Sequence, residues 1–432
     1  MKSKIIMSFL VLLTFSVKAQ TLDLETCLKM ADTANLTIVN ARLDVEINKK
    51  QIKSYEAAKL PKVIYAADYK YNAVIPGQLL PAEIVGGKPG TFATVQFGVP
   101  YVLSNTLQLS QVVYNPQVNY GVTALKINQE VIELQANLTA QNVKYQVMQT
   151  FFNLQATKKQ LDFIKENITN LDKLIKNMQA FVDQKMVIST EVDKLNITRL
   201  NLVNQQQTLT ATQEKIENFL KILIGKDITE KIDVLVDSSV EKSIITSTEA
   251  NSLIELQLIE AQKRLNIAEK SGIYMAYLPA FSFYAAYNYS YNIRPESNFG
   301  TGINGAFLGL KIDWTLFDGF EKYNKSKVNK MNADKLNNQM ESTRLQLEMN
   351  IENAKKQVEI QKTSLSISQE QLKLAQTINN QINASFEQGV VSSNDLVKNE
   401  TDLYQAQTNI VVAYLQLRQA ELELLKATGN IK

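Results

Sequence analysis

The sequence predicts a mainly α-helical protein with transmembrane β-strands, arranged as an internal two-fold structural repeat. Three observations predict this class. Motifs in residues 20–224 recur in the same order in residues 251–432, with residues 225–250 as a linker between the repeats. Four segments alternate apolar and polar side chains over ten or more residues. The long segments between them carry heptads of apolar residues.

The first 19 residues have the pattern of a secretory signal peptide. Lys2 and Lys4 form a basic start, residues 5–17 are mostly apolar, and small side chains favour cleavage after Ala19. An N-terminal membrane anchor is the alternative, but this apolar stretch is too short to cross a bilayer core of ~30 Å. The sequence therefore predicts export from the cytoplasm.

The composition argues against most enzymes and against nucleic-acid binding. The chain has 46 basic and 43 acidic residues, no histidine and one cysteine, Cys27, which we expect to be a small buried side chain. Removing residues 1–19 removes three lysines and leaves a formally neutral chain, which is a poor partner for nucleic acid. Without histidine, Ser-His-Asp triads and ordinary zinc sites are excluded. A carboxylate enzyme stays open in principle, but no acidic pair stands out; we expect no enzyme, no cofactor and no metal site.

The internal repeat rests on three motifs that recur in the same order. The matching pairs are Leu60 with Leu278 at an offset of 218 residues, Val113 with Leu316 and Tyr120 with Tyr323 at 203, and Gln184 with Gln388 at 204. Chance similarity is the alternative, and the shared order of three matches makes it a poor explanation. Each half is expected to contain a helix, two strands, a very long helix, a tip and a returning helix.

Four segments are predicted to be membrane strands, namely residues 62–74, 92–110, 280–293 and 302–316. Tilted transmembrane strands need ~9–11 residues, and a barrel wall needs one lipid-facing side and one polar side. Tyrosine rings suit the lipid–water boundary. The tyrosines expected there are Tyr69, Tyr71, Tyr287, Tyr289 and Tyr291. A soluble β-sandwich is the alternative.

Four strands from one chain cannot close a barrel with a usable opening, because barrel width grows with strand number. The wall is therefore expected to come from several chains. No run of 18 or more apolar residues follows the signal peptide, so the sequence predicts no helical span. Residues 73–91, rich in proline and glycine, are expected to form an exposed loop.

Heptads of apolar residues indicate coiled helices. Residues 161–182 place apolar side chains at steps of three and four, and Leu195 and Leu396 each begin a series with steps of seven. Residues 117–181 contain no proline and no glycine except Gly121, so one helix there would extend on the order of 90–100 Å. An ordinary soluble coiled coil stays open as an alternative.

Several of these segments are similar to those of one known family. Residues 22–28, with Ala31 and Asn35, resemble the first helix of the TolC-like outer membrane efflux proteins. Residues 113–115 and 316–320 resemble the ends of their second and fourth strands, and the two tip segments resemble their helical-hairpin turns. The resemblance covers essentially the whole mature chain.

The resemblance implies a fold and a function. Four strands from each of three copies would form one 12-stranded barrel, and long antiparallel coiled helices would continue it as a periplasmic tunnel. Residues 225–248 and those from about 426 would form an equatorial belt. The trimer would be a passive exit duct in the outer membrane, in an efflux or secretion system with a periplasmic adaptor and an inner-membrane transporter. The alternative is a periplasmic or surface coiled-coil structural protein without a pore.

The resemblance also implies functional residues at the tips. Glu191 and Asp395 would lie at the periplasmic entrance, where rings of carboxylates favour cations; a solvated surface is the alternative for both. Val391 and Lys398 stand where the family has a basic gate residue and a second acid, so its salt-bridge latch is not implied here. The residues expected to contact the adaptor are Lys185, Met186, Val187, Ile188, Ser189, Gly389, Val390, Val391, Ser392 and Ser393. A simple helix–helix turn is the alternative for them.

Overall fold

The structure, a computed structural model, describes residues 21–235, 243–245, 247, 249, 253–295, 299–388 and 390–431. The predicted signal peptide, part of the predicted linker 225–250 and Gly389 lie outside the described residues. The chain divides into two compact units. Unit 1 comprises Met1–Leu43, Leu134–Gln257 and Glu341–Lys432, and unit 2 comprises Asp44–Glu133 and Leu258–Met340.

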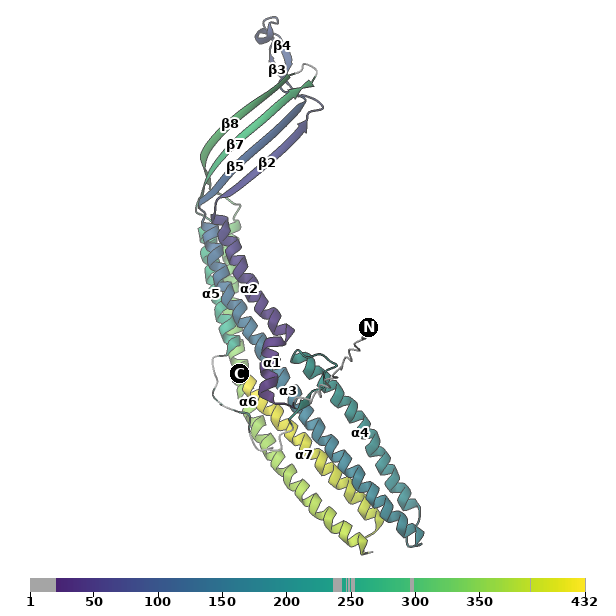
Figure 1. Cartoon of the computed structure of the whole chain (residues 1–432). Helices are drawn as coiled ribbons and strands as arrows, with labels where there is room; N and C mark the ends of the chain where they lie inside the picture. The colour runs from purple at the N-terminus through teal and green to yellow at the C-terminus, as the bar shows by residue number, and fades with distance from the viewer. Residues whose placement is uncertain are drawn as a thin grey trace, which may run out of the picture. The chain divides into compact units, whose positions relative to one another are not determined.

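Long helices and one four-stranded sheet make up most of the described chain (Figure 1). The helices are α1 (Leu24–Ala34), α2 (Leu36–Glu56), α3 (Pro116–Asp183), α4 (Thr190–Leu223), α5 (Ile254–Met275), α6 (Glu321–Glu387) and α7 (Ser393–Ala427), with short 3-10 helices η1 (Ala57–Lys59) and η2 (Ala82–Val85). The strands are β1 (Thr21–Leu22), β2 (Lys62–Tyr71), β3 (Gly77–Pro81), β4 (Phe92–Gln96), β5 (Tyr101–Tyr114), β6 (Asp233–Val234), β7 (Ala280–Arg294) and β8 (Phe299–Asp313). No helix in the described ranges combines the length and apolar character that a membrane span requires.

The two longest helices begin at corresponding repeat motifs. The side chain of Asn115 accepts hydrogen bonds from the backbone N–H groups of Gln117 and Val118 at 3.0 and 3.3 Å, which caps α3. Asp318, the matching residue 203 positions later, accepts from the backbone N–H of Lys322 at 3.1 Å at the start of α6. The motif therefore marks the change from strand to helix in each half.

The sheet of unit 2 is antiparallel, with strand order β2-β5-β7-β8 (Figure 1). Directly paired residues point to the same face of a sheet. Tyr69 pairs with Leu103, and Leu103 pairs with Tyr291, so the predicted apolar faces of three strands form one continuous face. Most side chains on this face of β2 and β8 are exposed in the single chain.

The segment predicted as one strand, 92–110, forms two strands in the structure. β4 pairs with β3 in a separate hairpin, and β5 pairs with β2 and β7. Gly98 has a φ of +142°, which turns the chain between them, and Pro100 cannot donate to a strand ladder. The predicted loop 73–91 contains β3 and η2, and this β3–β4 hairpin lies beyond the end of the sheet (Figure 1).

The helices of unit 2 pack in the same order as the strands. Asn48 on α2 donates to the carbonyl of Leu125 on α3 at 3.4 Å, and Asn266 on α5 donates to the carbonyl of Asn329 on α6 at 3.3 Å. Between these pairs, Gly272 on α5 lies against the ring of Tyr120 on α3. The order is therefore α2, α3, α5, α6.

Unit 1 is held by three apolar clusters. The first joins α1, α3, α4 and α7 with the two-stranded parallel sheet of β1 and β6, and it contains Cys27, which is fully buried as predicted. Burial raises the pKa of the Cys27 thiol to about 11, so the thiol is neutral at ordinary pH. The second cluster joins α3, α4, α6 and α7 near the tips, and the third joins α6 with α7. The heptad residues Leu171, Leu195 and Leu396 all belong to the second cluster.

Candidate functional site

The first hairpin tip is a tight turn between α3 and α4. Lys185 has a φ of +58°, and its backbone N–H donates to the carbonyl of Val182 at 2.9 Å. The next residue, Met186, donates to the carbonyl of Phe181 at 2.9 Å. This pattern of two bonds ends a helix with a left-handed residue, where glycine is usual. Lys185 thus adopts the conformation that its repeat partner, Gly389, would adopt more easily.

The side chains of the first tip divide between core and solvent. Val187 packs against the second apolar cluster, whereas Met186 and Ile188 are each 68% exposed. Ser189 precedes α4 and is exposed. Two large apolar side chains therefore project from the tip of the single chain.

The second tip connects α6 to α7. Ser392 caps α7, because its hydroxyl oxygen accepts from the backbone N–H of Asp395 at 3.2 Å. The same hydroxyl donates to the Asp395 carboxylate at 2.7 Å. Val390 is 75% exposed, and Val391 is half-buried. Both hairpins therefore carry exposed apolar side chains at their tips.

A hydrogen bond joins the two tips. The hydroxyl of Ser393, at the start of α7, donates to the carboxylate of Glu191, at the start of α4, at 2.7 Å. Lys194 also bonds this carboxylate, at 2.8 Å. These two partners hold the pKa of Glu191 below its usual value. Of the two acids predicted at the entrance, Glu191 therefore links the hairpins, whereas Asp395 is exposed and bonded within its own helix cap.

Aromatic rings and polar side chains also connect α3, α6 and α7 at positions further from the tips. Phe181 on α3 and Phe386 on α6 meet edge to face, with ring centroids 5.9 Å apart. Further along, Asn379 on α6 donates to the carboxylate of Glu400 on α7 at 3.0 Å, and both residues are buried. Asn167 on α3 donates to Gln407 on α7 at 2.6 Å. α7 is thus bonded to both of the long helices.

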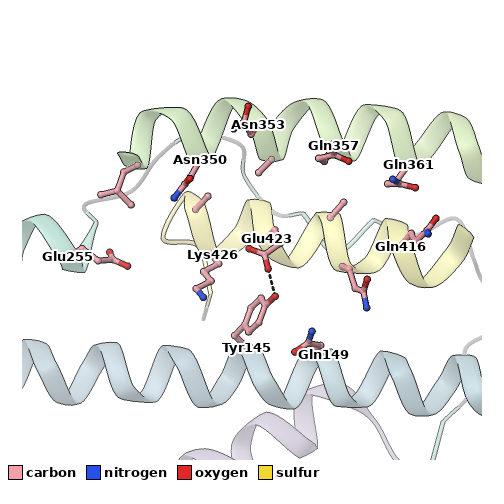
Figure 2. A pocket seen from close by; sticks show the side chains of 15 residues that line it. Tyr145, Gln149, Glu255, Asn350, Asn353, Gln357, Gln361, Gln416, Glu423 and Lys426 are labelled. Carbon is pink, nitrogen blue, oxygen red and sulfur yellow. Dashed lines mark hydrogen bonds between the residues drawn. The ribbon is translucent and has the colours of Figure 1, made fainter. Parts of the chain in front are cut away.

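A groove of 680 Å³ in unit 1 is lined by fifteen residues, and seven of them are amide side chains of α3, α6 and α7. Figure 2 shows Gln149, Asn353 and Gln357 among the side chains that surround it. The hydroxyl of Tyr145 donates to the carboxylate of Glu423 there, and Lys426 lies over the tyrosine ring at 4.8 Å (Figure 2). Burial and this carboxylate raise the pKa of Tyr145, so its phenol stays neutral. Such a surface can form hydrogen bonds with water and solutes.

The predicted interface tyrosines share one face of the sheet. Tyr69 and Tyr71 on β2 stack against Tyr101 on β5, with ring centroids 6.2 and 4.8 Å apart. Tyr287, Tyr289 and Tyr291 follow on β7, at positions paired with odd-numbered residues of β5. Tyr71, Tyr101 and Tyr291 lie at the end of the sheet next to the β3–β4 hairpin, where a boundary between lipid and water would lie if the sheet spans a membrane.

Residues 255–430 match the family model of the outer membrane efflux protein. The second half of the chain belongs to the outer membrane efflux protein family. None of the curated proteins is similar enough in sequence to match the chain. The family segment contains β7, β8, α6 and α7, and hence the second tip, Asp395 and Glu400.

Three solved outer membrane proteins have the same fold. The outer membrane protein VceC from Vibrio cholerae has a TM-score of 0.71 and 11% identity, over 94% of this chain and 96% of that one. The CmeC outer membrane channel of Campylobacter jejuni has a TM-score of 0.72 and 14% identity, over 94% and 85%. The MtrE outer membrane channel of Neisseria gonorrhoeae, in its open state, has a TM-score of 0.72 and 14% identity, over 95% and 89%. The fold of these three outer membrane proteins therefore extends over nearly the whole chain.

Several buried polar residues of α6 and α7 could not be recognised from the sequence. Asn379, Glu400 and the pair Arg418–Glu421 are buried within these helices. Glu421 lies beside the heptad positions Leu417 and Leu424, and in sequence alone it resembles the exposed acids of the same helix. In the described part of the chain no three or more His, Cys, Asp or Glu side chains group as a metal site.

Proposed function

We propose that this chain forms the outer membrane channel of a tripartite efflux or secretion system, and that three copies make one passive exit duct. Residues 1–19 are its signal peptide, and residues 20–224 and 251–432 are two structural repeats joined by the equatorial linker 225–250. The duct performs no chemistry on the solutes that it conducts.

One observation carries this proposal. The sheet β2-β5-β7-β8 has two unpaired edges, formed by β2 and β8. These two strands expose apolar and aromatic side chains that a water-soluble protein would cover. Leu308, Leu310 and Ile312 of β8 are 76%, 76% and 62% exposed in the single chain. Lipid would cover this face, and a second copy would cover each open edge. Three copies supply twelve strands, which is wide enough for an aqueous opening.

The tips are proposed to face the periplasmic adaptor and, through it, the inner-membrane transporter. Met186, Ile188 and Val390 provide an apolar contact surface that would be covered when the adaptor docks. Glu191 and Asp395 are proposed to surround the entrance and to favour cations there. The bond from Ser393 to Glu191 would then stabilise the closed arrangement of the two hairpins.

Membrane fractionation followed by planar-bilayer recording tests the proposal. The purified protein should be extracted from the outer membrane with detergent as a trimer and should conduct ions in a lipid bilayer. A soluble monomer without conductance would instead support a structural coiled-coil protein. A membrane trimer that conducts ions but does not restore efflux in a strain that lacks its own efflux channel would support the channel and contradict its role in a pump.

A further inference from the structure

The two strand hairpins of the sheet have the same register. Shifting β2 by 218 residues and β5 by 203, the offsets of the repeat motifs, converts the β2–β5 pairs into β7–β8 pairs. Lys62 with Ser110 becomes Ala280 with Asp313, and Tyr71 with Tyr101 becomes Tyr289 with Asn304; the structure contains both of the resulting pairs. The offsets were read from sequence motifs, so the agreement in strand pairing is independent of them.

The same shifts can be applied to the junction between the two halves. β5 pairs with β7 there, and the equivalent pair beyond the open edge is β8 with β2 of another copy. Gln108, which pairs with Ala286, corresponds to Lys311, and Ala286 corresponds to Asp68. We propose that the subunits of the channel join with Lys311 of β8 directly opposite Asp68 of the partner subunit. This register rests on the proposed trimer, and it specifies which residues pair at the seam, that is, where β8 of one subunit meets β2 of the next.

Charge selects the same register without reference to the repeat. Lys311 and Asp68 are both exposed and carry opposite charges, which stabilises a directly opposed pair. A shift of two residues in one direction would place Lys311 opposite Lys70 of the partner subunit and Asp313 opposite Asp68 of the partner subunit, which are two repulsive pairs. The opposite shift would place Lys311 opposite Ala66 of the partner subunit. A shift of one residue would place the apolar side chains of β8 on the same face of the sheet as the polar side chains of β2.

The helices support the same seam. At the junction within the chain, Tyr120 covers Gly272, where an added Cβ would meet the ring at 2.4 Å. The equivalent residues at the open edges are Tyr323, which is 56% exposed, and Ser54 of the partner subunit, which is also a small residue with an exposed side chain. Tyr323 would therefore cover Ser54 of the partner subunit.

The register also predicts strand formation at assembly. The pair Gln111–Phe283 corresponds to Trp314 opposite Tyr65 of the partner subunit, yet β8 ends at Asp313 in the single chain. Trp314 is 58% exposed, and a neighbouring β2 would extend the ladder past it. Two aromatic rings would then meet across the seam, an arrangement that stabilises paired strands.

Cysteine cross-linking tests the register in the full-length membrane protein. Directly opposed strand residues have Cα atoms ~4.5–5.5 Å apart, which suits a disulfide, whereas diagonal neighbours lie ~7–8 Å apart. The buried native Cys27 can be retained. Lys311→Cys with Asp68→Cys should give covalently linked trimers on oxidation, severalfold more than Lys311→Cys with Lys70→Cys or with Ala66→Cys. The single variants are the controls and should give none.

Each outcome separates the register from the proposed function. A trimer that links best through Lys70→Cys or Ala66→Cys, or through none of the three pairs, would overturn the register and leave the channel standing. A protein that is monomeric in detergent before oxidation would overturn the trimer itself. As a second measurement, Lys311→Glu alone should lower the yield of trimer, and adding Asp68→Lys should restore it. A double variant no better than the single one would count against the pair.

Discussion

Ser393 and Glu191 lie 202 residues apart in sequence and are joined by a hydrogen bond of 2.7 Å between a hydroxyl and a carboxylate. The bond connects the start of α7 to the start of α4, so it ties one hairpin tip to the other. Neither side chain is bulky, and the carboxylate has Lys194 as a second partner. The connection can therefore be broken by a small substitution without creating a cavity in the core.

Replacing Ser393 by alanine should make the entrance easier to open. The change removes the hydroxyl donor and leaves Glu191 bonded to Lys194, so the fold should be preserved. We expect a higher open probability in planar bilayers. Ser392→Ala, which alters the cap of α7 but not the bond between hairpins, is the matched control. Equal open probability in both variants would contradict the role of the bond.

The bond between the tips should also resist acid until low pH. The pKa of Glu191 in the folded chain is lowered, so the stabilisation is fully present above the ordinary value of 4.5 and is lost as the pH falls through the lowered value. Conductance of the wild type should thus be constant from neutral pH down to 4.5 and should rise only below it. Glu191→Gln should remove this acid response, and a response that persists would assign it to other groups.

The two acids at the tips should set ion preference. Replacing both Glu191 and Asp395 with alanine removes two carboxylates per copy from the proposed entrance. We expect weaker cation selectivity and weaker block by multivalent cations, measured from reversal potentials in asymmetric salt. Glu341→Ala with Glu348→Ala removes two acids from the exposed surface of α6 and serves as the control. Unchanged selectivity would mean that the tip acids are only surface charge.

The buried ion pair on α7 should be essential for stability. Arg418 and Glu421 are 4% and 1% exposed, their side chains lie 2.7 Å apart, and the guanidinium lies 5.0 Å from the ring of Tyr414. Glu421→Ala would leave a buried charge without its carboxylate and should cost about 3–5 kcal/mol. Glu341→Ala, which breaks an exposed pair with Arg344, should have a much smaller effect on stability because water screens that pair. Thermal unfolding measures both, and similar losses would refute the difference.

The conformation of Lys185 should store strain. A left-handed backbone costs a residue with a Cβ roughly 1–2 kcal/mol, and glycine avoids this cost. Lys185→Gly should therefore raise the unfolding temperature. Lys173→Gly, in the interior of α3, should lower it by a comparable free energy of ~1 kcal/mol. Destabilisation by both variants would show that the tip relaxes in solution.

Much of the fold follows from local pattern, and its limits have physical causes. Period-two alternation indicates β2 and β7 because one face meets a different medium from the other. The same alternation continues through Val95, Phe97, Val99 and Tyr101, although Gly98 and Pro100 end one strand and begin another there. Alternation reports which face a residue occupies and contains no information about which strand it pairs with.

The candidate site was less accessible to sequence reasoning. The tips could be placed because the segment that begins at Gln184 recurs at Gln388 and resembles helical-hairpin turns of a known family, and Glu191 and Asp395 could be aligned through the repeat. The bond from Ser393 to Glu191 depends on how two hairpins pack, and no spacing along the chain encodes it. Glu400 and Arg418 are buried because helices from distant segments surround them. In the sequence, these charged residues resemble those that face solvent.

The charged residues on the open strands also bear on a copy that has not yet assembled. Lys311 pairs with Asp313 on its own strand at 2.9 Å, and β2 presents Asp68 and Lys70 along the other edge. Charges on an exposed edge discourage indiscriminate strand addition by unrelated chains. Under the proposed function, a subunit that has not yet assembled would thus be protected from aggregation until its edge strands pair with those of another copy.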